Sequence, residues 1–189
     1  ALVSPINTND TDMFILNTET GAKTKVNKTV SANTPQSVAP DGKSFYYTTD
    51  DGGEFSYVMQ YNLENGTTKK VVEKEWDING YSFSEKGTYQ TTFINEDAKN
   101  SLEIKEVATD NAVEFPTFEG KEITNVSFSR DEEAVLLRVG GSNTPSDSYS
   151  YNLKSKTLSR LTENLNNAIN DDALVSAKVI RFTSFDGVE

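Results

Sequence analysis

The feature that most constrains this sequence is a pattern that returns every 45 residues. Short polar turns, rich in Asn, Gly and Thr, each follow a brief apolar run. The four turns are Asn17–Gly21, Asn62–Gly66, Val107–Asn111 and Asn152–Lys156. A fixed period of this length indicates that one small structural unit is copied along the chain and that neighbouring copies pack against one another.

A second marker keeps the same step without a gap. Its copies are Ser37–Gly42, Ser82–Gly87 and Ser127–Glu132, and each precedes a run rich in β-branched or aromatic residues. Small polar turns recur in any all-β protein, so one marker alone would carry little weight. Two markers that share one period favour a true structural repeat.

The order of elements inside one copy indicates its fold. Residues 36–72 read as four strands separated by turn residues such as Pro40-Asp41-Gly42. The predicted strands are Gln36–Ala39, Ser44–Thr49, Phe55–Asn62 and Thr68–Val72. Four antiparallel strands in a repeat of this length form one blade of a β-propeller. Helical repeats of similar length, such as HEAT and armadillo, would not contain these β-branched runs and Gly turns.

The phase of the repeat sets the domain boundaries. One period before Tyr46–Thr49 lies Ala1–Ser4, so the sequence is expected to open inside the second strand of a blade and to be a piece of a longer chain. We therefore predict an all-β protein, a β-propeller fragment of four-stranded antiparallel blades. The partial propeller spans 1–162, with a partial blade at about 1–31 and complete blades at 34–73, 78–117 and 122–162. An open fragment exposes apolar faces and is expected to self-associate.

The repeat does not continue into the C-terminal part of the chain. Apolar residues at four-residue steps predict a short helix over Glu163–Ser176, for which Asn170–Asp172 is a candidate cap. Those apolar residues are Leu165, Ile169, Ala173 and Leu174. Val179–Phe185 is expected to form a strand, and Asp186-Gly187 a turn after it. Residues 163–189 therefore read as a linker and the first strand of another domain.

Composition removes several kinds of chemistry. The sequence has no His and no Cys, so Ser-His-Asp and Cys-His catalysis are excluded, as are metal sites built on His or Cys. No Gly-x-Ser-x-Gly motif is present. Carboxylate-only catalysis and oxygen-ligand metal sites stay open. We predict no catalytic, cofactor-binding or metal-binding residue in this chain, and no cofactor.

The net charge of −11 constrains the partners. Such an acidic surface repels phosphate backbones and anionic membranes, so we expect neither nucleic acid nor lipid as a partner. No apolar run approaches the 18 residues or so of a membrane-spanning helix. The compartment stays open between the cytoplasm and the periplasm for a soluble protein.

Three clusters could carry chemistry, and each has a plainer explanation. Asp50–Glu54 offers oxygen ligands for Ca²⁺, but a hairpin turn explains it. Asp131–Glu133 could pair carboxylates for acid–base catalysis, but its place in the repeat favours a solvated blade turn. Gly140–Ser142 resembles part of a phosphate-binding loop but lacks the Gly-Lys-Ser/Thr that must follow, so a plain loop is expected.

Three further features have alternative interpretations. Trp76 could be a platform for a ligand, although packing between blades is the commoner role of such a residue. Asn27–Thr29 and Asn65–Thr67 are glycosylation sequons. They matter only if the protein enters a glycosylating secretory pathway.

Four segments carry a resemblance to a known family. They are Ala39–Lys43, Leu161–Asn164, Asn170–Val175 and Val179–Gly187. Their order resembles the junction in prolyl oligopeptidase-type serine peptidases, the S9 clan, in which a β-propeller precedes an α/β-hydrolase domain. That hydrolase begins with Ser-x-Asp-Gly, which Ser184–Gly187 matches. The later blade turns depart from the Ala39–Lys43 motif, so the resemblance is firmest from about 120 to 189.

The resemblance implies a parent protein that hydrolyses peptides with a Ser, an Asp and a His encoded after residue 189. This chain would then be a non-catalytic propeller that gates the access of small peptides to the hydrolase domain of the same polypeptide. The alternative is a TolB-like propeller that binds a protein partner and is not an enzyme. The resemblance maps no gating residue, peptide specificity or total blade number.

Overall fold

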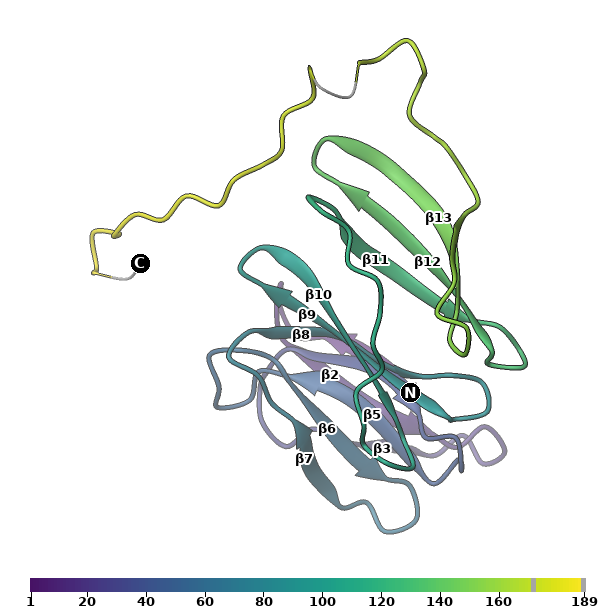
Figure 1. Cartoon of the computed structure of the whole chain (residues 1–189). Coiled ribbons are helices and arrows are strands. Elements are labelled where there is room, and N and C mark those ends of the chain that lie inside the picture. The colour runs from purple at the N-terminus through teal and green to yellow at the C-terminus, as the bar shows by residue number, and fades with distance from the viewer. Residues whose placement is uncertain (171–172, 188–189) are drawn as a thin grey trace. The chain divides into compact units, whose positions relative to one another are not determined.

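The computed structural model describes residues 1–170 and 173–187, and its regular structure is almost entirely antiparallel β-strand (Figure 1). The first two sheets contain β1 (Leu2–Pro5), β2 (Thr11–Leu16) and β3 (Lys23–Lys25), then β4 (Asn33–Val38), β5 (Ser44–Thr49), β6 (Tyr57–Asn62) and β7 (Thr68–Val72). The other two contain β8 (Asp77–Phe83), β9 (Tyr89–Glu96) and β10 (Lys99–Glu106), then β11 (Glu122–Phe128), β12 (Ala134–Gly141), β13 (Thr144–Asn152) and β14 (Leu158–Arg160). Within the described residues, no helix has the length and apolar character needed to cross a membrane.

The four sheets correspond to the four predicted blades. In each sheet the strands pair in sequence order, so every connection inside a sheet is a hairpin. The prediction of a complete four-stranded blade at 78–117 is wrong in one respect. The third sheet has three strands, and its fourth is reduced to a single bridge between Lys105 and Ala112. Pro116, which follows shortly after, has no amide hydrogen to extend a ladder.

The second sequence marker forms the same turn in each copy, at Ser37–Gly42, Ser82–Gly87 and Ser127–Glu132. The amides of Gly42, Gly87 and Glu132 each donate to a carbonyl three residues earlier, at 2.8–2.9 Å, and all three residues have positive φ. Glycine adopts this conformation without strain, whereas Glu132 holds it as a non-glycine residue with a φ of 63°. The 45-residue period is therefore a period in backbone geometry.

The other marker is shifted by one residue in the third sheet. The side-chain oxygens of Asn17, Asn62 and Asn152 each accept amide hydrogens from the residues two and three positions later. The predicted alignment starts the third copy at Val107. The structure instead places Glu106 at this position, because its amide donates to Asn111 as that of Asn62 donates to Thr67.

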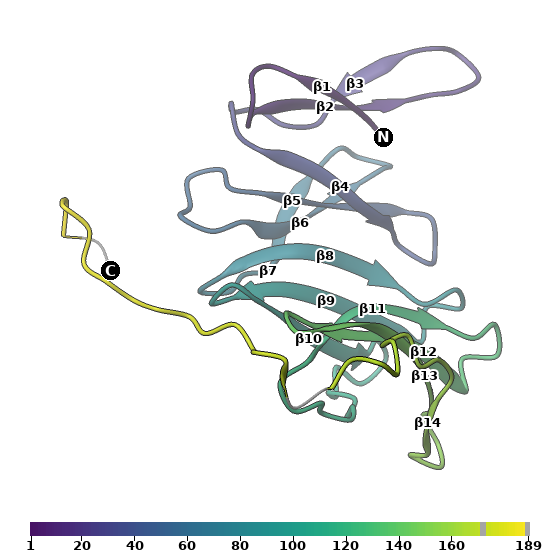
Figure 2. The same cartoon turned by 90° about the horizontal axis from the view of Figure 1, so that it is seen from above.

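The chain divides into two compact units, residues 1–96 with 101–115 and residues 97–100 with 116–189, and each is described separately. The sheets of the first unit follow one another in a stack (Figure 2). Each of its two core clusters takes residues from successive sheets. Every residue of β5 is buried, because Phe45 and Tyr47 belong to the cluster shared with the first sheet while Tyr46 belongs to the cluster shared with the third. A strand buried on both faces fits a sheet that packs on two neighbours.

Gln36 joins two sheets of the first unit. It lies at a register shift of β4, between Pro35 and Ser37, where one residue is left out of the ladder. Its side-chain oxygen accepts the amide of Tyr81 on β8 at 3.1 Å, and its nitrogen donates to Thr48 Oγ1 at 3.0 Å. The bulge thus turns a side chain toward the neighbouring sheet.

In the second unit, β12 is covered mainly on one face. Val135, Leu137 and Val139 are buried, whereas Leu136 and Arg138 between them are exposed. This alternation with period two is the pattern of a sheet with one buried face.

The predicted helix over Glu163–Ser176 is wrong for the described residues. Asn166 Oδ1 accepts the amide of Ala168 at 2.9 Å, and the Asn166 carbonyl accepts that of Ile169 at 2.8 Å, so the chain forms turns. Asn side chains compete with a helix by bonding nearby backbone groups. Asp171 and Asp172 of the candidate cap lie outside the described residues.

The last segment is extended and unpaired in the part of the chain that the structure describes. Val179–Phe185 is not a strand there, because a strand needs a partner. The predicted turn is present, with the Gly187 amide donating to the Ser184 carbonyl at 3.0 Å and Gly187 at a φ of 85°. The assignment of residues 163–189 to a linker and the first strand of another domain stays a prediction.

Candidate functional site

Two of the three clusters noted in the sequence are turns. The expectation of a plain loop at Gly140–Ser142 is wrong, because Gly140 and Gly141 end β12 and only Ser142 lies in the turn that follows. Asp50 Oδ1 accepts the Ala32 amide at 2.9 Å, which fixes the hairpin turn at Asp50–Glu54 to the preceding loop. Gly140 lies where a Cβ would approach Ser146 Oγ to 2.5 Å, so the glycine serves a close hairpin packing. Among the described residues, no three acidic side chains are grouped as a metal site would require.

The Asp131–Glu133 turn differs from the expected solvated turn. Asp131 Oδ1 accepts hydrogen bonds from Ser129 Oγ at 2.5 Å and from the Glu133 amide at 3.1 Å, which is ordinary turn chemistry. Glu132, however, is only 6% exposed. Glu132 has a positive φ at the turn position where the other copies have Gly42 and Gly87.

Trp76 packs as expected between blades. Its ring lies 5.8 Å from that of Phe55, centroid to centroid, with Phe55 in the β5–β6 loop and Trp76 just before β8. An aromatic pair at this distance contributes packing energy. The indole is thus part of the packing between the second and third sheets.

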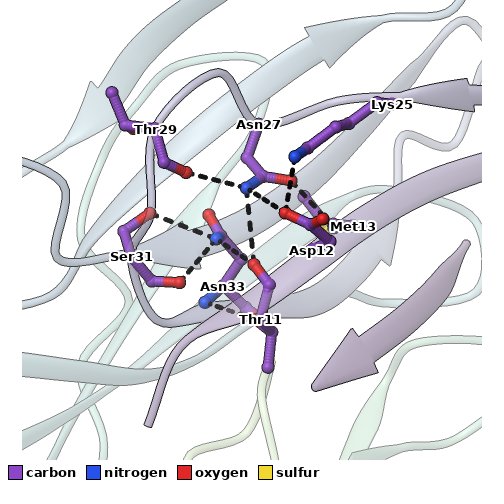
Figure 3. Close-up of polar contacts among 8 residues, drawn as sticks. All are labelled: Thr11, Asp12, Met13, Lys25, Asn27, Thr29, Ser31 and Asn33. Carbon is purple, nitrogen blue, oxygen red and sulfur yellow. Dashed lines mark hydrogen bonds and ion pairs between the residues drawn. The ribbon is translucent and has the colours of Figure 1, made fainter. Parts of the chain in front are cut away.

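The two sequons differ in accessibility. Asn27 is 7% exposed, its oxygen accepts the Met13 amide at 2.8 Å, and its nitrogen donates to the Thr29 carbonyl at 2.9 Å (Figure 3). A glycan on this nitrogen would have to break the network. Asn65 lies exposed in the β6–β7 turn.

The same network fastens β4 to β2. Asn33 donates from its side-chain nitrogen to the carbonyls of Thr11 and Ser31, each at 2.9 Å (Figure 3). Nearby, Lys25 forms an ion pair with Asp12 at 2.7 Å, and this hydrogen bond lowers the pKa of the Asp12 carboxyl. These hydrogen bonds link residues of β2, the loop after β3 and β4, so the network holds the first two sheets together.

The strongest candidate site is the place where the chain leaves the last blade, and Asp147 on β13 is its centre. Asp147 is 4% exposed. Its Oδ2 accepts a hydrogen bond from Arg160 Nη2 at 2.6 Å. Its Oδ1 accepts one from Thr162 Oγ1 at 3.0 Å and one from the Asn164 amide at 2.9 Å. We call these four residues the exit node.

Opposing effects act on the pKa of Asp147. Burial raises it, but the hydrogen bonds from Arg160, Asn164 and Thr162 lower it further than burial raises it, so the pKa lies below its ordinary value. The hydrogen bond between Arg160 and Asp147 in turn raises the pKa of the Arg160 guanidinium. The carboxylate is therefore ionised and fully bonded at neutral pH, which suits a structural anchor and not a general acid or base.

A second set of contacts fixes the linker further along. The Ala177 amide donates to Ser142 Oγ at 2.8 Å, and Asn143 Nδ2 donates to Ser176 Oγ at 3.1 Å. Ser142 and Asn143 form the turn of the β12–β13 hairpin. This hairpin tip therefore holds the linker about thirty residues further along the chain.

An ion pair follows, and the apolar side chains on both sides of it are exposed. Arg181 Nη2 lies 2.6 Å from Asp97 Oδ1. Asp97 belongs to the two-residue turn between β9 and β10, in which both residues have positive φ, as this type of hairpin requires. Ile180, Phe182 and Phe185 are 82%, 76% and 102% exposed, respectively. These three large apolar side chains have little contact with the rest of the described chain.

The exit node was missed in the sequence. Asp147 and Arg160 are 13 residues apart in separate strands, and only the register of the β13–β14 hairpin brings them together. The available signal was a pair of opposite charges inside the blade predicted at 122–162. Asn164 lies in a segment that carried the family resemblance, but nothing in the sequence marked its amide as a donor.

Comparison with known proteins decides the family. The family model of the prolyl oligopeptidase N-terminal β-propeller domain matches residues 2–164. The chain belongs to this family. The matched range of this prolyl oligopeptidase propeller ends at Asn164, the last residue of the exit node. A comparison with curated protein sequences gave no significant match.

Solved structures share the fold of this propeller. A puromycin-hydrolysing peptidase of Mycobacterium tuberculosis has a TM-score of 0.71 at 17% identity, covering 95% of this chain and 28% of that one. A structure from a study of two prolyl endopeptidases has a TM-score of 0.62 at 13% identity, covering 82% of this chain and 25% of that one. TolB of Acinetobacter baumannii has a TM-score of 0.58 at 16% identity, covering 82% of this chain and 38% of that one. The chain spans well under half the length of each.

Proposed function

We propose that this propeller is the non-catalytic part of a serine peptidase and limits the access of peptides to a hydrolase domain that follows it. The single observation that carries the proposal is the family match, which stops at the exit node. The anchored linker then leads into Val179–Phe185, whose apolar side chains are exposed. A hydrolase domain that adds strands to this segment would cover them.

The gating role rests on geometry and needs no reactive group. Sheets packed around a ring admit extended peptides and exclude folded proteins by size. The contacts that keep successive sheets together, such as the one made by Gln36 between β4 and β8, would then set how tightly the ring excludes large substrates.

The test uses the protein expressed from its full reading frame. Cleavage of a short peptide is compared with cleavage of the same sequence inside a folded domain, for the wild type and for Gln36→Ala. We expect the variant to gain activity on the large substrate and to keep it on the short one. Lys154→Ala, in the exposed β13–β14 turn, is the matched control. A wild type that cleaves the enclosed sequence as fast as the short peptide would refute gating, and equal size selection in all three proteins would refute the part assigned to Gln36.

A TolB-like binding propeller is the second candidate, because TolB of Acinetobacter baumannii shares the fold. This second candidate predicts that the full protein cleaves neither the short peptide nor the same sequence inside a folded domain. A Ser-directed phosphonate probe that labels the full protein would argue against it, and the absence of labelling would favour it.

A further inference from the structure

The second unit contains a cavity of about 600 Å³ beside the linker. Its walls come from the tip of the β9–β10 hairpin, the loop before β11, the β12–β13 turn and the linker residues 176–179. A volume of this size is within the roughly 300–1,000 Å³ typical of ligand pockets. The linker contacts at Ser142 and Asn143 hold one of its walls in place.

The cavity is lined by basic residues in an acidic protein. Lys99, Lys121 and Lys178 line it, while the whole chain has a net charge of −11. The one lining carboxylate, Glu122, already accepts hydrogen bonds from the amide and side chain of Asn100, at 2.9 and 3.2 Å. Across the described ranges, none of the three lysines forms an ion pair. Their charges are available to an anionic ligand.

The cavity also has an apolar wall. Phe118 lines it, and its ring is held 5.0 Å from that of Tyr149, centroid to centroid. Val179 of the linker and Ala98 of the hairpin tip add further apolar surface. A ligand that combines negative charge with a neighbouring apolar group would match both kinds of wall.

We propose that this cavity binds an acidic peptide segment with an apolar side chain between its carboxylates. The lysines pair with the carboxylates, and the side chain packs against Phe118. The rest of the acidic surface repels a long polyanion, so a short segment is the ligand that fits. The proposal goes beyond gating and does not depend on it, because binding can be measured without any catalytic turnover.

The test is fluorescence anisotropy with the protein from its full reading frame. The probe is a fluorescein-labelled peptide of sequence Glu-Leu-Phe-Glu, compared with Lys-Leu-Phe-Lys. We expect the acidic probe alone to bind, with an affinity that falls as salt is added. Lys99→Glu and Lys178→Glu, both at exposed positions, should each weaken binding about tenfold.

Lys156→Glu is the matched control, because Lys156 is exposed in the β13–β14 turn and does not line the cavity. Equal weakening by this control would mean general electrostatic attraction and would overturn the proposal. So would failure of the acidic probe to bind, or binding that survives both cavity substitutions. Loss of size selection in the gating experiment with anisotropy unchanged would count against the proposed function alone.

Discussion

Asp147 is the residue on which the geometry of the chain's exit depends most. It brings together a strand, the arginine of the next strand and the backbone of the outgoing linker. Removing this buried carboxylate costs free energy, because Arg160, Thr162 and the Asn164 amide would lose their acceptor.

Asp147→Asn tests this anchor. The amide keeps the shape but loses the charge and one of the acceptor sites, so the free energy of unfolding should fall by about 1–3 kcal/mol at neutral pH. Urea denaturation followed by circular dichroism measures the change. Asp110→Asn removes the carboxylate of an exposed pair with Lys105 and should change little. Equal effects from the two substitutions would contradict the anchor.

The same group sets a pH dependence. Its folded pKa is lowered from the ordinary value of 3.8, so its stabilising contribution is present above that value and is lost as pH falls through the folded pKa. The stability difference between wild type and Asp147→Asn should therefore shrink in acid below about pH 4. Denaturation midpoints measured across the acid range check the sign.

Lys156→Gly is expected to stabilise the protein. Lys156 is exposed and holds a φ of 58° at the turn position where two other copies have Gly21 and Gly66, with φ of 72° and 70°. Glycine adopts this region without the steric cost of a Cβ, so the free energy of unfolding should rise by about 0.5–1 kcal/mol. The reciprocal substitution Gly66→Ala should lower the thermal midpoint, since its Cβ would also lie 3.3 Å from Tyr61 Oη.

At the scale of elements, strands were predictable and their irregularities were not. Strand positions follow from local alternation and turn residues, which is why Ser44–Thr49 was predicted with the bounds that β5 has. The bulge at Gln36 depends on the neighbouring sheet and leaves no local signal. The helix prediction failed because a four-residue apolar spacing was weighed above the Asn residues that form turns there.

The linker contacts make a prediction for limited proteolysis. Ser142→Ala removes the acceptor of the Ala177 amide, and loss of one hydrogen bond of about 1 kcal/mol should raise the open population of the linker about fivefold. Trypsin cleavage after Lys178 or Arg181 should accelerate accordingly, as followed by mass spectrometry. Ser155→Ala, which removes a hydroxyl pair with Thr157 in the β13–β14 turn, should leave this rate unchanged.

At the scale of the whole molecule, the period of the sequence was enough to predict the propeller, and the family match confirms it. The function of the propeller could not be predicted in the same detail as its fold. The proposed gating would depend on the propeller as a whole, so no single residue of one sequence indicates it.

Self-association of the 189-residue chain is expected at this scale. Ile180, Phe182 and Phe185 expose apolar surface that water solvates poorly. Replacing all three with Ser should lower the apparent mass in light scattering at high concentration. A wild-type chain that stays a monodisperse monomer under those conditions would contradict the expectation.

The hydrogen bond from the Tyr81 amide to Gln36 Oε1 spans one full repeat and has a consequence for how the protein folds. The hairpins of a sheet are local and can form early, but the Gln36 side chain is satisfied only once the next sheet exists. Neighbouring sheets of the first unit should therefore melt together, as one cooperative unit, and their slowest-exchanging amides should share one opening free energy. The first unit, although built from copies, would in this way lose its structure as a whole and not copy by copy.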